Sequence, residues 1–160
     1  MSRSNTWKSP THCNQARREV SLPKFQTERR VEFADTDAAG ICHFASFIRY
    51  MEEAEHAMLR SAGLGVLHHE VDGQQVSWPR VSVQCDYQRP ARFEDVLQLE
   101  VWVSRLGTKS ATFTCEFHHD GHPIATGKVT AACCIVGAGG QPQAIAIPPS
   151  YLAELKRFQA

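Results

Sequence analysis

The sequence lacks several features that would each indicate a particular class of protein. No apolar run is long enough to span a bilayer, and the first two dozen residues contain no apolar signal-peptide core. The 17 basic and 17 acidic residues balance, which argues against a nucleic-acid-binding surface. Internal repeats are absent. We therefore expect a cytoplasmic protein that inserts into no membrane and binds no nucleic acid.

The six cysteines include no C-x-x-C pair, and without a signal sequence they indicate a reducing compartment in which disulfides are not expected. Cys42 lies beside an acidic loop, but no neighbouring residue is arranged to activate it as a nucleophile. A group formed by His68, His69, Glu70 and Asp72 resembles a set of metal ligands. It falls in an irregular segment, residues 64–75, so a solvated loop is favoured and no metal site is predicted.

The length of 160 residues predicts one domain. Residues 1–24 are polar and have no helical period, so we expect a disordered arm there and a single folded domain over residues 25–160.

The centre of the sequence is an apolar helix that follows an acidic loop. Ser46 is a plausible N-cap and Gly63 a plausible residue just beyond the end, giving about 16 helical residues or about 24 Å. The apolar positions recur at three- and four-residue steps. They are Phe44, Phe47, Met51, Ala54, Met58 and Ala62, widened by Ile48, Tyr50 and Leu59.

Strand-like segments surround this helix. Residues 25–33 are extended, and residues 81–87, 97–103, 111–117 and 124–136 alternate apolar and polar positions or are rich in β-formers. In the first of these four, Val81, Val83, Cys85 and Tyr87 should form a buried face. Asp120-Gly121 predicts a hairpin, and Ser150 can cap a last short helix. Short connections require an antiparallel sheet packed over the helix, which is an α+β fold.

One curled sheet cannot cover a helix that is apolar on so many sides, and its edge strands remain unpaired. We therefore expect a homodimer or a dimer of dimers.

The acidic loop has chemical meaning because it precedes the positive end of the helix. The first N–H groups of a helix are unpaired and bind an oxyanion well. Asp37, on a loop turned by Gly40, can face a carbonyl whose oxygen rests on those groups. This placement predicts attack on an acyl group, although an Asx-type loop carboxylate is the structural alternative.

Two stretches resemble the hotdog-fold acyl-CoA thioesterases of the 4-hydroxybenzoyl-CoA thioesterase type. They are D-T-D-A-A-G at residues 35–40, followed by I-C-H-F-A-S-F, and D-Y-Q-R-P-A-R-F-E-D at residues 86–95. The resemblance covers roughly residues 25–136. It implies a hotdog fold, an antiparallel sheet wrapped around one long central helix, and an acyl-CoA substrate that carries the CoA itself, with no other cofactor.

The resemblance also implies roles for residues of the loop. Asp37 matches the catalytic carboxylate, the backbone N–H of Phe44 matches the donor that polarises the thioester carbonyl, and Gly40 matches a glycine of close approach. Asp35 is the alternative base, although the match gives it a supporting place. Asp37 could act as nucleophile or as general base, and the sequence leaves both open.

Two further polar residues are candidates by the same match. Relatives such as the Tol-Pal-associated thioesterase have Tyr-His where this chain has His43-Phe44, so their histidine is displaced by one position. Glu52 matches an acidic position and either orients the loop or forms a salt bridge. His56, with Glu52 and Glu53, could bind a metal, but a polar dimer contact is favoured.

The phosphates of CoA require basic or donor side chains, and Arg89, Arg92, Lys109 and Ser110 are the candidates. A thiolate is a good leaving group, so thioester hydrolysis needs little help from a general acid that would protonate it. Two other functions remain possible. A hotdog-fold dehydratase or hydratase would need an acid/base pair. A non-catalytic acyl-CoA-binding module would still bind acyl-CoA after replacement of Asp37.

Overall fold

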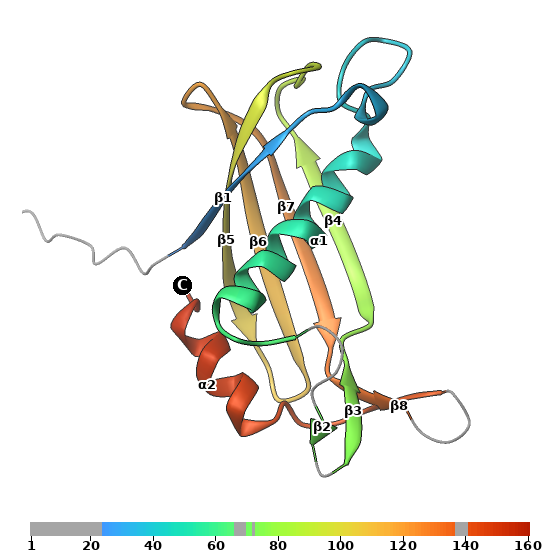
Figure 1. Cartoon of the computed structure of the whole chain (residues 1–160), viewed down its shortest axis with the longest axis vertical. Coiled ribbons are helices and arrows are strands. Elements are labelled where there is room, and N and C mark those ends of the chain that lie inside the picture. Colours follow the sequence, from blue (N-terminus) through green and yellow to red (C-terminus); the bar gives the residue numbers. More distant parts are fainter. Residues whose placement is uncertain (1–23, 66–69, 72, 137–140) are drawn as a thin grey trace, which may run out of the picture.

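The computed structural model describes residues 24–65, 70–71, 73–136 and 141–160. One long helix, α1, lies across one face of a five-stranded antiparallel sheet (Figure 1). The strands follow the order β1-β5-β6-β7-β4, so β1 and β4 are the edges. The bounds are α1 Phe44–Ser61, β1 Phe25–Arg30, β4 Arg80–Tyr87, β5 Val96–Leu106, β6 Ser110–His119 and β7 His122–Ala132. The expected α+β fold, with an antiparallel sheet around a central helix, is confirmed.

A second, smaller antiparallel sheet was not predicted. Its order is β2-β3-β8-β9, with bounds Glu70–Val71, Gln74–Ser77, Cys134–Val136 and Pro142–Ala144. The irregular segment predicted over residues 64–75 therefore contains strands, and the single strand predicted over residues 124–136 is wrong. The chain leaves the large sheet at Cys133, because its N–H donates to the Lys109 carbonyl while its own carbonyl accepts from Ile145. His68, His69 and Asp72 lie outside the described residues.

The ends of the helices differ from the predicted ones. Helix α1 has 18 residues and its N-cap is His43, not Ser46, because His43 Nδ1 accepts the Ala45 N–H at 3.2 Å. The Ser46 hydroxyl donates instead to the Asp35 carbonyl. Gly63 follows the C-cap of α1 with a φ of +71°, as expected.

Other local predictions are corrected in the same way. Strand β1 ends at Arg30, before a 3-10 turn, η1 (Phe33–Asp35). The last helix, α2 (Pro149–Arg157), has Pro148 rather than Ser150 at its N-cap position and no side-chain cap. No helix among the described residues has the length and apolar character needed to cross a membrane. The predicted arm lies outside the described residues except for Lys24, which pairs with two glutamates of the sheet.

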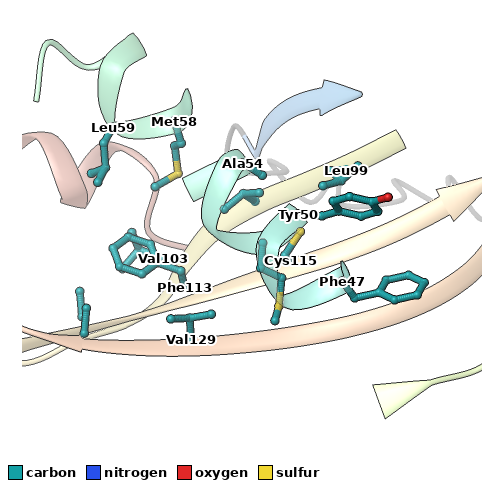
Figure 2. Packing of buried hydrophobic residues seen from close by; sticks show 14 of the residues in the cluster. Phe47, Tyr50, Ala54, Met58, Leu59, Leu99, Val103, Phe113, Cys115 and Val129 are labelled. Atoms are coloured by element: carbon teal, nitrogen blue, oxygen red, sulfur yellow. The ribbon is translucent and has the colours of Figure 1, made fainter. Parts of the chain in front are cut away.

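The core lies between α1 and the large sheet (Figure 2). Phe47, Met51 and Met58 of α1 are buried as predicted. Gly127 in β7 allows this packing, because a Cβ at that position would lie 1.8 Å from Met51 Sδ. The glycine therefore leaves room for the Met51 side chain against the centre of the sheet.

The predicted buried face of β4 is largely exposed. Val81, Val83 and Tyr87 are 62%, 43% and 47% exposed, because β4 is an edge strand that has a neighbouring strand on one side only. On α1, Phe44 is 61% and Ile48 37% exposed. Tyr87 contacts Phe44 at one end of β4 and Arg80 contacts α1 at the other. We call the five exposed apolar side chains the β4 strip; they are Val81, Val83 and Tyr87 of β4 and Phe44 and Ile48 of α1.

A buried carboxylate, Glu55, lies in the middle of α1. Its Oε1 is 3.1 Å from Arg80 Nη2, and its Oε2 has no hydrogen-bond partner among the described residues. Burial raises the pKa of Glu55 to about 7; the Arg80 charge opposes this effect and the nearby Glu52 charge adds to it.

This raised pKa predicts a pH-dependent stability. The folded state holds the Glu55 proton to higher pH than the unfolded state does, so stability present at low pH is lost as pH rises through about 7. The wild type should lose on the order of 3 kcal/mol of unfolding free energy between about pH 5 and about pH 8, since each tenfold change in proton affinity corresponds to about 1.4 kcal/mol. Glu55→Gln should abolish this loss.

Urea unfolding of both proteins at the two pH values measures this difference. Burial and the Arg80 charge lower the pKa of His56, so His56 makes stability rise with pH. This contribution is present in both proteins and cancels in the comparison. The exposed neighbour Glu53→Gln is the control. An unchanged pH dependence in Glu55→Gln would contradict the assignment.

Candidate active site

The acidic loop is a tight turn closed by backbone hydrogen bonds. Asp37 N–H donates to the Ile41 carbonyl and Gly40 N–H donates to the Asp37 carbonyl, both at 2.9 Å. Gly40 has a φ of +72°, which a side chain would disfavour, so the predicted turning role of this glycine is supported by its conformation. The Asp37 Oδ1 accepts the Ala39 N–H at 2.8 Å, while Oδ2 has no hydrogen bond within the described residues.

The loop is fixed to the connection between β4 and β5. Cys42 N–H donates to the Ala91 carbonyl at 2.8 Å, and Ile41 forms a bridge with Arg92. At its other end, His43 N–H donates to the Asp35 carbonyl at 2.7 Å. The carboxylate and the start of α1 are therefore held by one continuous backbone network.

The first turn of α1 presents an unpaired donor. The Ala45 N–H is accepted by the His43 ring and the Ser46 N–H by the His43 carbonyl. Within the described residues, the Phe44 N–H has no acceptor. It lies at the positive end of the helix, where an oxyanion would be stabilised.

A pocket of about 460 Å³ brings the carboxylate and this residue together. Its lining residues are Asp37, Ile41, Cys42, Phe44, Phe47, Tyr87, Gln88, Arg89, Pro90 and Ala91. A larger hollow of about 560 Å³ lies over β1 and β5 and contains no helix N-terminus. We therefore place the candidate site in the smaller, mostly apolar pocket.

Asp35 occupies a different environment from Asp37. Its buried carboxylate accepts hydrogen bonds from Arg49 and Tyr50, both at 2.6 Å, and from the Glu32 N–H. Burial alone would raise the pKa of Asp35, but these hydrogen bonds and the nearby arginine charges lower it below its usual value. Asp35 does not line the pocket, so Asp37 is the carboxylate that a substrate would meet.

The structure brings some of the other candidates to the pocket and leaves others away from it. Arg89 lines the pocket, and Arg92 lies beside Ile41. Lys109 and Ser110 lie at the β5–β6 turn, at the far end of the sheet from the acidic loop (Figure 1). Within one chain, these two cannot act together with Asp37.

His43 and Glu52 also lie outside the lining. His43 serves as the N-cap of α1. Glu52 is exposed, with Oε1 3.9 Å from both His56 Nε2 and Arg80 Nη2. No group of three potential ligands, including the one suggested around His56, is assembled among the described residues.

Sequence reasoning missed the aromatic walls of the pocket. Alternation in the sequence predicts a buried strand face for Tyr87, and the helical period predicts a core position for Phe47. Nothing in the sequence shows that the acidic loop pairs with residues 91–92. The D-Y-Q-R-P-A motif was the available signal. Cys42 is buried, and burial raises the pKa of its thiol, which disfavours a reactive thiolate.

Two proteins of known function are similar to this chain in sequence. A 1,4-dihydroxy-2-naphthoyl-CoA hydrolase of Synechococcus elongatus is 31% identical over 112 residues, 70% of this chain and 82% of that protein. The acyl-CoA thioester hydrolase YbgC of Escherichia coli is 27% identical over 138 residues, 83% of this chain and 96% of that protein.

The fold is shared as well. The crystal structure of Slr0204, a 1,4-dihydroxy-2-naphthoyl-CoA thioesterase from Synechocystis, superimposes with a TM-score of 0.73 at 20% identity, covering 84% of this chain and 96% of that one. Residues 31–155 match the family described as the thioesterase-like superfamily. This match spans most of the chain, including both motifs and the pocket, and the protein therefore belongs to the thioesterase-like superfamily of hotdog enzymes.

Proposed function

We propose that Asp37 and the Phe44 N–H are the two groups with which this chain hydrolyses an acyl-CoA to the free acid and CoA. The family makes the chain an acyl-CoA thioester hydrolase. The observation that carries the assignment of residues is the meeting of a half-exposed carboxylate and an unpaired helix N–H at one pocket.

The chemistry requires no other side chain. The thioester oxygen would accept a hydrogen bond from the Phe44 N–H. This N–H stabilises the negative charge that develops on the oxygen as the carbonyl carbon becomes tetrahedral. Asp37 then either attacks the carbon, forming an anhydride that water opens, or removes a proton from an attacking water. The thiolate of CoA leaves without protonation, because the pKa of a thiol is about 8.5.

The acyl group proposed for this pocket is aromatic. Phe44, Phe47 and Tyr87 supply ring surfaces, and Ile41 and Pro90 complete apolar walls that would bury a planar group. The name of the Synechococcus relative, a naphthoyl-CoA hydrolase, supports the same class.

The remaining candidates fit a complex with the CoA phosphates and a second copy of the chain. Arg89 and Arg92 lie on the pocket side and can meet the phosphates directly. Lys109 and Ser110 could contribute only from a second copy. We propose a homodimer or a dimer of dimers, in the cytoplasm, where the five described cysteines remain free thiols.

The two alternatives make different demands on the pocket. A hydratase or dehydratase needs an acid/base pair, but no histidine is among the lining residues described. A binding module would retain acyl-CoA without turning it over. The experiment is release of free thiol from aromatic, branched and straight-chain acyl-CoAs by the wild type and by Asp37→Asn. Binding without turnover in the wild type would favour the binding module.

His43→Gln should leave turnover within about threefold of the wild type. The His43 ring caps α1 but does not line the pocket, so its loss should cost about 1 kcal/mol of stability rather than the reaction. Thermal unfolding and kcat measured together test this. A loss of kcat comparable to that in Asp37→Asn, at nearly unchanged stability, would make His43 part of the mechanism.

A further inference from the structure

The chain contains three tyrosines, Tyr50, Tyr87 and Tyr151. Each hydroxyl donates a hydrogen bond to an oxygen of another segment: to Asp35 Oδ2 at 2.6 Å, to the Phe44 carbonyl at 3.0 Å and to the Gly65 carbonyl at 2.8 Å. The first bond ends at the base of the acidic loop, the second ends at the first turn of α1, and the third ends just beyond the opposite end of α1. The three residues therefore offer an internal comparison.

Tyr50 acts on the loop that carries Asp37. Its ring is buried within the core (Figure 2), and its hydroxyl reaches the Asp35 carboxylate. The Asp35 carbonyl accepts the His43 N–H, so this one residue closes the loop that spans residues 36–42. Burial and the hydrogen bond to Asp35 raise the pKa of Tyr50, so the hydroxyl keeps its proton. The bond thus ties the base of the Asp37 loop to the second turn of α1.

Tyr87 acts on the other half of the site. Its hydroxyl donates to the carbonyl of Phe44, the residue whose N–H is the candidate oxyanion donor. Its ring packs edge-on against Phe47, with centroids 5.4 Å apart, which fixes the direction of the hydroxyl. Burial is the main cause that raises the pKa of Tyr87 to about 12, so this donor also persists at neutral pH. The bond holds the first turn of α1 against the end of β4.

We propose that Tyr50 and Tyr87 are positioning residues that align the two catalytic groups separately, Tyr50 through Asp35 for the Asp37 loop and Tyr87 for the Phe44 N–H. The inference rests on the proposed function of Asp37 and Phe44. Neither hydroxyl reacts with substrate. Each prevents a small displacement of a group whose placement within about 1 Å decides the rate.

Tyrosine-to-phenylalanine variants test the proposal, because each keeps the ring and removes one hydroxyl. Tyr50→Phe and Tyr87→Phe should each lower kcat about tenfold or more and leave KM within about threefold. Tyr151→Phe is the matched control: Tyr151 and Tyr50 are both 1% exposed, and Tyr151 lies away from the pocket. It should lower the thermal midpoint without changing kcat.

The double variant sharpens the test. Because one backbone network joins the Asp37 loop to the start of α1, the fold loss in kcat of Tyr50→Phe/Tyr87→Phe should exceed either single loss and fall short of their product. All assays are run at a temperature at which circular dichroism shows every variant folded. The proposal is overturned if the two variants behave like Tyr151→Phe, losing stability but not kcat, or if only KM rises. Asp37→Asn separates the two failures: full turnover in that variant would remove the proposed function itself.

Discussion

Replacing Asp37 with asparagine is expected to lower kcat by about 10²- to 10⁴-fold, which corresponds to about 3–5 kcal/mol of barrier. The change should leave the loop intact. The Asn side-chain oxygen can still accept the Ala39 N–H, and the turn is otherwise closed by backbone bonds of Asp37, Gly40 and Ile41. What the variant loses is the carboxyl group that lines the pocket.

Asp120→Asn is the control for this substitution. Asp120 is an exposed carboxylate in the β6–β7 turn with a φ of 47°, a conformation that asparagine also tolerates. It should keep the wild-type kcat. If Asp37→Asn remained folded and lost less than about tenfold in kcat, Asp37 would not be the base or the nucleophile.

The elements that the sequence predicted are those in which one local pattern carries the information. The period of α1, Gly63 at its end and the Asp120-Gly121 turn depend on neighbouring residues alone, and the fold has all three. The predicted start of α1 was wrong because the His43 ring nitrogen caps the helix, and histidine is not among the preferred N-cap residues. The small sheet was missed because its strands are short and because the pairing of β3 with β8 joins segments far apart in the sequence.

In the candidate site, too, the residues that are close in sequence were predicted and the contacts between distant segments were not. Asp37, Gly40 and Phe44 are close in sequence, and their motif pointed to them directly. The Tyr87 contact with Phe44 and the bridge between Ile41 and Arg92 join segments far apart, so no local pattern contains them. Alternation in β4 correctly predicted a strand, yet periodicity cannot distinguish a face covered by its own helix from one left open at a sheet edge.

That open edge predicts the interface between two copies. Strand β4 pairs on one side only, with β7, and so offers a row of unpaired backbone donors and acceptors. The β4 strip adds exposed apolar surface on the helix side of the same edge. Two of its members, Phe44 and Tyr87, also line the pocket, so a partner that covers the strip would close one wall of the site. Shielding from water would also strengthen the attraction of the Phe44 N–H for a carbonyl oxygen.

Val83→Lys is therefore expected to dissociate the assembly and to abolish most of the turnover together. Val83 is 43% exposed in the single chain, so a lysine there should leave the folded chain intact, whereas in the assembly its charge would be buried without a partner at a cost of several kcal/mol. Gln84→Lys is the matched control, because Gln84 is exposed on the opposite face of the same strand. Light scattering and specific activity across a dilution series measure both effects, and the wild type should lose activity as it dissociates. A wild-type monomer with full specific activity, or a Val83→Lys variant that remained assembled and active, would contradict an interface on β4.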